Sequence, residues 1–170
     1  MAIFFRKEVD GFTQYEISRG SHYCKGWRIR SCGSRLKFIF KFSDSCMYNP
    51  ASVIPGYNKL TGIVQLSIAS PGVHENSIRI GWISKGNTLQ LALYCYVEGE
   101  RTVIDICTTQ PDTENTGEIS IGGGVYTVTI NGQTATCPQA YTGGAKFKLF
   151  PYFGGQSTAT ATMDIYIKEI

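Results

Sequence analysis

The sequence predicts an all-β protein: an antiparallel β-sandwich of the jelly-roll type with little or no helix. Apolar and polar residues alternate with a period of two in many segments, whereas helical periodicity is nearly absent. Turn-forming residues recur between these segments, and the chain contains 19 glycines. Aromatic residues make up 12% of the chain, which suits the half-buried surface of a sheet.

The first clear strand is expected at residues 36–42, where four apolar side chains share one face and two lysines lie on the other. A second strand is expected at residues 63–68. The intervening residues 44–61 contain two prolines and several Asn and Gly, so we interpret them as a long loop.

The centre of the chain predicts a three-stranded meander. Residues 77–84 alternate, with Arg79 on the face opposite the apolar side chains. Gly86-Asn87 can adopt the positive φ angles of a tight turn into residues 89–97. A second turn then leads into a strand at residues 101–107.

The C-terminal part predicts further strands. Residues 125–130 and 133–137 flank Asn131-Gly132, the strongest hairpin signal in the chain, because both turn residues tolerate positive φ. Strands are also expected at residues 146–153 and 160–170. The total of about nine to eleven short strands is typical of a sandwich or barrel.

The length of 170 residues fits one domain, and no repeat or linker divides it. We therefore predict a single β-sandwich domain over residues 1–170, with the jelly-roll core in residues 36–170. Residues 1–35 are less regular, and we interpret them as a candidate arm that packs on a partner.

Charge and hydropathy argue against two classes of partner. The net charge of +3 and the absence of a polybasic run are too weak to indicate nucleic acid. No stretch approaches the ~18 apolar residues of a membrane span. The N-terminus lacks the long apolar core of a signal peptide, so we expect synthesis in a host cytoplasm.

No metal or cofactor is predicted. The six cysteines contain no C-x-x-C pair, which disfavours zinc, and Cys95 and Cys107 fit apolar strand patterns as small core residues. Asp44, Asp105 and Asp112 are scattered, so the sequence does not indicate a calcium site.

Two segments carry a family resemblance. One is His74-x-Asn76-Ser77-x-Arg79-x-x-Trp82 with the strand through residues 94–101, and the other is residues 149–155 leading to residues 163–165. With the Asn-Gly hairpin between them, the chain resembles concanavalin A-like jelly-roll proteins of gut bacteria and their bacteriophages, over roughly residues 36–170. Lectins and jelly-roll polysaccharide lyases are broader relatives.

The resemblance also implies a departure from the group's pattern. Such relatives often carry extra histidines near the position of His74 and another before the aspartate of the last strand. Here only His74 remains in the first place, and Met163 stands in the second. If those histidines performed chemistry, we expect this chain to have lost it.

A glycan-binding face needs flat aromatic rings with polar groups beside them. The candidate residues are Tyr94, Tyr96, Arg79, His74, Lys148 and Tyr152. The structural alternative is that the tyrosines fill a half-buried sheet and Arg79 pairs with an acid, while Trp82 belongs to the core. No catalytic residue is assigned, because uronate cleavage needs a base and a cation and no spacing singles them out.

The leading functional hypothesis is a non-enzymatic bacteriophage virion structural protein, such as a capsid decoration, auxiliary or head-fibre protein. It would mediate assembly with other virion proteins or with itself as a homo-oligomer on the virion surface, with surface polysaccharide as a further candidate partner. The alternatives are a lectin-like carbohydrate-binding module and a polysaccharide-lyase-like enzyme. A secreted or cell-surface location applies if a signal segment has been removed.

Overall fold

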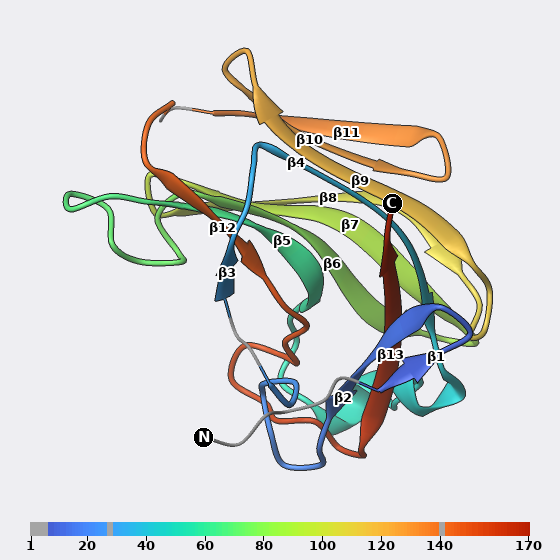
Figure 1. Cartoon of the computed structure of the whole chain (residues 1–170). Helices are drawn as coiled ribbons and strands as arrows, with labels where there is room; N and C mark the ends of the chain where they lie inside the picture. Colours follow the sequence, from blue (N-terminus) through green and yellow to red (C-terminus); the bar gives the residue numbers. More distant parts are fainter. Residues whose placement is uncertain (1–6, 27–28, 140–141) are drawn as a thin grey trace, which may run out of the picture.

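The computed structural model describes residues 7–26, 29–139 and 142–170, and it folds into two facing antiparallel sheets (Figure 1). The only helical pieces among the described residues are two short 3-10 turns, η1 (Asp44–Cys46) and η2 (Pro50–Ser52). The prediction of an all-β antiparallel sandwich with little helix is therefore confirmed.

The first layer is a seven-stranded sheet in the order β1-β2-β13-β4-β9-β10-β11. Its strands are β1 (Glu8–Val9), β2 (Phe12–Ile17), β13 (Met163–Glu169), β4 (Arg35–Phe42), β9 (Asn115–Gly122), β10 (Val125–Ile130) and β11 (Gln133–Pro138). The hairpin between β10 and β11 turns at Asn131 and Gly132, which have φ angles of 49° and 82°. Both angles are positive, as the Asn-Gly signal predicted.

The second layer is a six-stranded sheet in the order β3-β12-β5-β6-β7-β8. Its strands are β3 (Ile29–Ser31), β12 (Ala145–Leu149), β5 (Asn58–Leu66), β6 (Ser77–Lys85), β7 (Thr88–Val97) and β8 (Glu100–Thr109). Strands β6, β7 and β8 pair in sequence, which confirms the predicted meander.

The core lies between the two sheets, where alternate side chains of each strand meet. Phe42 of β4 packs on Trp82 of β6, with ring centroids 5.1 Å apart. Trp82 is fully buried, as expected from the face it shares with Ile78 and Ile80. The same alternation directs Arg79 and the other intervening residues of β6 to the outer face of the six-stranded sheet.

The structure differs from the predicted element boundaries before β5, and it also describes most of the N-terminal segment. Residues 1–35, interpreted as a candidate arm, include β1 and β2 of the seven-stranded sheet and β3 of the other; residues 1–6 and 27–28 lie outside the described part. Strand β5 begins at Asn58, so the end of the expected loop 44–61 is wrong. Cys32, Cys46, Cys95, Cys107 and Cys137 are free thiols, and no helix in the described part is long and apolar enough to cross a membrane.

Candidate functional site

The site lies on the outer face of the six-stranded sheet, which points away from β9 and β10 (Figure 1). On this face Arg79 of β6 stands between Gly62 of β5 and Tyr94 of β7 in the pairing register. A Cβ atom at Gly62 would come within 2.5 Å of the Arg79 Cγ atom. Gly62 therefore leaves the space that the stem of Arg79 occupies.

Arg79 is a buried cation at the centre of this face. Its exposed fraction is 6%, its Nε atom is buried without a hydrogen-bond partner, and no ion pair in the described part of the chain includes it. Burial lowers the pKa of the guanidinium, and nearby tyrosines led by Tyr94 and Tyr96 oppose that shift. A buried charge without an acidic partner is unfavourable for stability, so it favours an anion that a ligand supplies.

Lys59 adds a second cation beside Arg79, at the start of β5. Its Nζ atom donates a hydrogen bond to the Gly154 carbonyl at 3.1 Å and lies 4.7 Å from the centroid of Tyr94 and 5.5 Å from that of Tyr152. Burial, with repulsion from Arg79 and Arg101, lowers the pKa of Lys59 to about 8. Lys59 was not among the predicted site residues, because the prolines and glycines around it predicted a loop where the structure has the start of β5.

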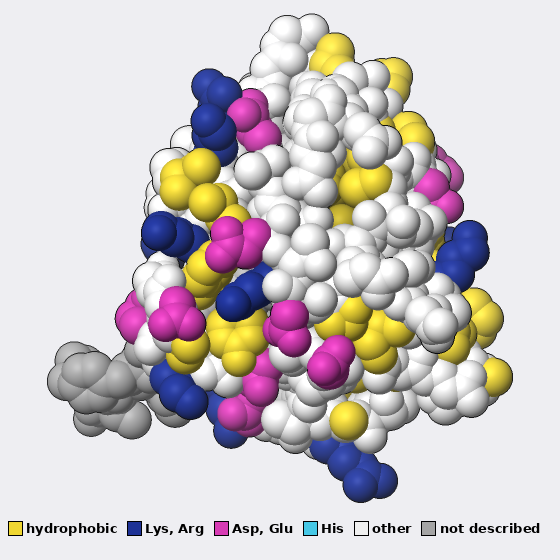
Figure 2. Space-filling view, turned by 90° about the vertical axis from the view of Figure 1, so that its right-hand side faces the viewer, with side chains coloured by type: hydrophobic (Ala, Val, Ile, Leu, Met, Phe, Trp, Pro, Cys, Tyr) yellow, Lys and Arg dark blue, Asp and Glu magenta, His cyan; other side chains and the backbone are white. Residues whose placement is uncertain are grey.

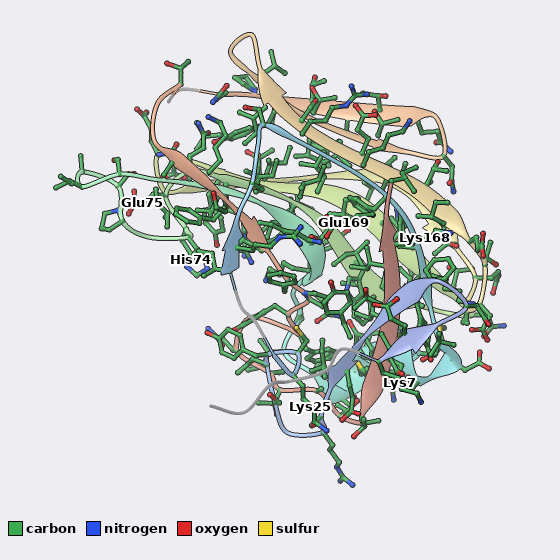
Figure 3. All side chains as sticks on the ribbon, in the orientation of Figure 1. Lys7, Lys25, His74, Glu75, Lys168 and Glu169 are labelled. Carbon is green, nitrogen blue, oxygen red and sulfur yellow. The ribbon has the colours of Figure 1, made fainter. Side chains whose placement is uncertain are left out.

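Tyr94 and Tyr96 lie side by side on β7, with hydroxyl oxygens 3.3 Å apart. Burial, reinforced by Tyr96, raises the pKa of Tyr94 to about 12. His74 comes from the long loop between β5 and β6 (Figure 3), and its ring lies 4.9 Å from that of Tyr96. Burial, with the positive charges of Arg79 and Lys59, lowers the pKa of His74, so its imidazole is neutral at neutral pH.

Tyr152 follows β12 and is fixed to the sheet through its backbone. It exchanges two backbone hydrogen bonds with Lys59, of 2.8 and 2.9 Å. The imidazole of His22 stacks on its ring at 5.3 Å with an interplanar angle of 9°. Burial and Tyr23 raise the pKa of Tyr152, whereas the positive charge of Arg79 lowers it.

These side chains line one cleft of about 540 Å³, within the range of sites that bind small ligands. Lys59, Arg79 and Arg101 supply positive charge to its walls, and among the described lining residues there is no Asp or Glu. By contrast, the side of the molecule shown in Figure 2 carries acidic and basic side chains interspersed. The cleft is thus suited to a negatively charged ligand.

Five of the six candidate glycan-face residues line this cleft, namely His74, Arg79, Tyr94, Tyr96 and Tyr152. Lys148 does not. It points to the opposite face of β12 from Leu149, is buried, and forms an ion pair with Glu169 of β13. Glu169 also pairs with Arg30 at 2.7 Å, so Lys148 belongs to a charge cluster between the sheets.

No family model matches the chain, and neither does any curated protein. Solved structures with a similar fold include PL7 alginate lyases. AlyA1 from Zobellia galactanivorans gives a TM-score of 0.56 at 17% identity, covering 92% of this chain and 62% of its own. The enzyme vAL-1 from Chlorella virus gives 0.58 at 15% identity, covering 97% and 86%, and AlyC3 gives 0.63 at 9% identity, covering 94% and 74%.

At these identities the likeness shows the fold, and it places the chain among concanavalin A-like jelly rolls, as the resemblance of residues 36–170 implied. Another structure of similar fold, alginate lyase A1-II′, is a member of polysaccharide lyase family 7. In this chain, the outer face of one sheet carries a cationic cleft.

The expectation of a non-enzymatic virion structural protein is wrong. It depended on the apparent lack of a signal peptide, the modest charge and the lack of a recognisable site, yet the similar structures AlyA1, vAL-1 and AlyC3, each aligned over more than nine-tenths of this chain, are alginate lyases. Catalytic roles could not be assigned from the sequence because the residues of the cleft come from separate strands and loops, so that no spacing along the sequence singles out Lys59, Arg79 and Tyr152.

Proposed function

We propose that this protein binds an acidic polysaccharide in the cleft and cleaves it at a uronate residue by β-elimination. The observation that carries the proposal is Arg79, a buried and unpaired cation on the floor of a cleft whose described lining contains no acid. The fold similarity to alginate lyases supports the same class of substrate.

β-Elimination on a uronate has two chemical requirements. A base removes the proton from the carbon next to the carboxylate, and the electrons form a carbon–carbon double bond as the glycosidic C–O bond breaks. The leaving oxygen then takes up a proton. A cation on the carboxylate stabilises the charge that develops beside it, and Arg79 is placed to supply this, since a guanidinium binds a carboxylate through two parallel hydrogen bonds.

The cleft also provides groups that can move the two protons. His74, with its lowered pKa, offers a neutral imidazole that can accept a proton. Tyr152 remains protonated at neutral pH because its pKa is raised, so it can donate to the leaving oxygen. We assign Tyr152 this role because its ring contacts Lys59 and it lines the same cleft as Arg79, which would bind the carboxylate.

The test is a panel of alginate, polygalacturonate and glucuronate-containing polymers, with ultraviolet absorbance of the unsaturated product as the readout. We expect turnover on at least one polymer and a loss of about a hundredfold or more in kcat/KM for Arg79→Gln. Arg35→Gln is the matched control, because Arg35 pairs with Glu118 on the other sheet. A panel without unsaturated product would exclude the lyase, and binding without cleavage would instead support a lectin-like module.

A further inference from the structure

The last strand of the six-stranded sheet carries opposite charges along one face. On β8, Arg101 pairs with Tyr96, Val103 with Tyr94 and Asp105 with Ala92. These β8 side chains therefore lie on the same outer face as the cleft. Arg101 and Asp105 are four residues apart, or about 13 Å along the strand at about 3.3 Å per residue.

Asp105 is separated from the cleft by a tyrosine. The Tyr57 hydroxyl donates a hydrogen bond to the Asp105 carboxylate, and the Tyr57 ring lies over Gly81. A Cβ atom at Gly81 would be 3.0 Å from Tyr57 Cδ1, so the sheet makes room for this ring. Tyr57 lines the cleft and Asp105 does not, so the pair forms a wall with a negative charge behind it.

Arg101 lies at the other end of the same strand and lines the cleft. It stands two strands from Arg79, which corresponds to about 9.5 Å across the sheet. A carboxylate bound at Arg79 is therefore distinct from one bound at Arg101. A polyanion that crosses the β8 edge meets an attractive charge at Arg101 and a repulsive one at Asp105.

We infer that an acidic glycan leaves the cleft across β8 at Arg101, where a uronate further along the polymer is bound, and that the Tyr57–Asp105 pair closes the alternative path. This inference rests on the proposed function in that an acidic glycan occupies the cleft. It adds a second carboxylate subsite and a direction for the bound chain.

The test measures the affinity of alginate-derived oligouronates by calorimetry, from the disaccharide to the hexasaccharide. A Tyr152→Phe background removes the proposed proton donor, so that the ligand is not consumed. We expect Arg101→Gln to weaken the longest oligomers about tenfold and the disaccharide less than about twofold, because one charge-assisted hydrogen bond is lost only where the ligand reaches it.

Asp105→Asn keeps an oxygen that can accept from Tyr57 but removes the repulsive charge. Added to Arg101→Gln, it should restore much of the affinity for long oligomers, whereas Asp10→Asn, an equal charge change on the β1–β2 turn, should not. An equal loss at every length, or no rescue by Asp105→Asn, would overturn the inference. If binding depends on length but the wild-type protein releases no unsaturated product, only the lyase chemistry is overturned; no binding at any length would overturn both proposals.

Discussion

The outer faces of the two sheets differ in the burial of their arginines and in whether those arginines have an acidic partner. On the seven-stranded sheet, Arg35 of β4 is exposed and forms a two-pronged pair with Glu118 of β9, with both hydrogen bonds at 2.9 Å. On the six-stranded sheet, Arg79 is buried and has no acidic partner in the described part of the chain. A surface pair adds little to stability, whereas a buried lone cation opposes folding. The second face therefore has a feature that stability alone does not explain, and ligand binding does.

The strongest way to break this comparison is to make the buried cation apolar. Arg79→Met should lower kcat/KM by about a hundredfold or more, yet raise the free energy of unfolding by about 1–3 kcal/mol, because the buried charge is removed while much of the side-chain volume is retained. Activity assays and urea denaturation measure the two effects. Arg35→Met should leave activity unchanged, and a destabilised Arg79→Met variant would contradict our view of this residue.

Glycine substitutions sharpen the comparison between the two sheets. Gly62→Ala should destabilise the protein by about 3 kcal/mol, because the new Cβ would meet the Ile78 carbonyl and the Arg79 stem. Gly122 of β9 has no atom within 4 Å of the corresponding position, so Gly122→Ala should have little effect on stability. Thermal denaturation of both variants measures the difference, and equal stabilities would show that the Ile78 carbonyl and the Arg79 stem can both move away from Gly62.

The lowered pKa of Lys59, the second cation of the cleft, predicts the direction in which stability changes with pH. The pKa of Lys59 falls from 10.5 to about 8 on folding, so between these values the unfolded chain binds more protons than the folded one. The contribution of Lys59 to stability should therefore rise as pH increases from about 8 to 10.5. Denaturation midpoints across this window should show the rise in the wild type relative to Lys59→Met. A constant difference between the two proteins would refute the shift.

Much of the fold was predictable because alternation and turn chemistry are local. Trp82 and the Asn131-Gly132 hairpin followed directly from the sequence, and Arg79, Tyr94 and Tyr96 were placed on one face because β6 and β7 are consecutive. The site was less accessible. The prolines before β5 led to the prediction of a loop that included Tyr57 and Lys59. No local sequence pattern indicates that Gly62 pairs with Arg79. The burial of Arg79 without an acidic partner is a property of the tertiary structure. The functional hypothesis from the sequence lacked this observation and was wrong.

The smallest expected effect concerns Lys148, which the sequence placed on the glycan face. In a strand, adjacent residues point to opposite faces. Because Leu149 lines the cleft, its neighbour Lys148 points into the space between the sheets, where it pairs with Glu169. Lys148→Met should leave oligouronate affinity within about twofold of the wild type, since Glu169 keeps Arg30 as a partner and the cleft keeps its three cations. Calorimetry beside Arg79→Met provides the scale. If Lys148→Met weakened oligouronate binding as much as Arg79→Met, the charge of Lys148 between the sheets would have to act on the ligand. The proposed difference between Arg79, which binds the ligand, and Lys148, which does not, would then be contradicted.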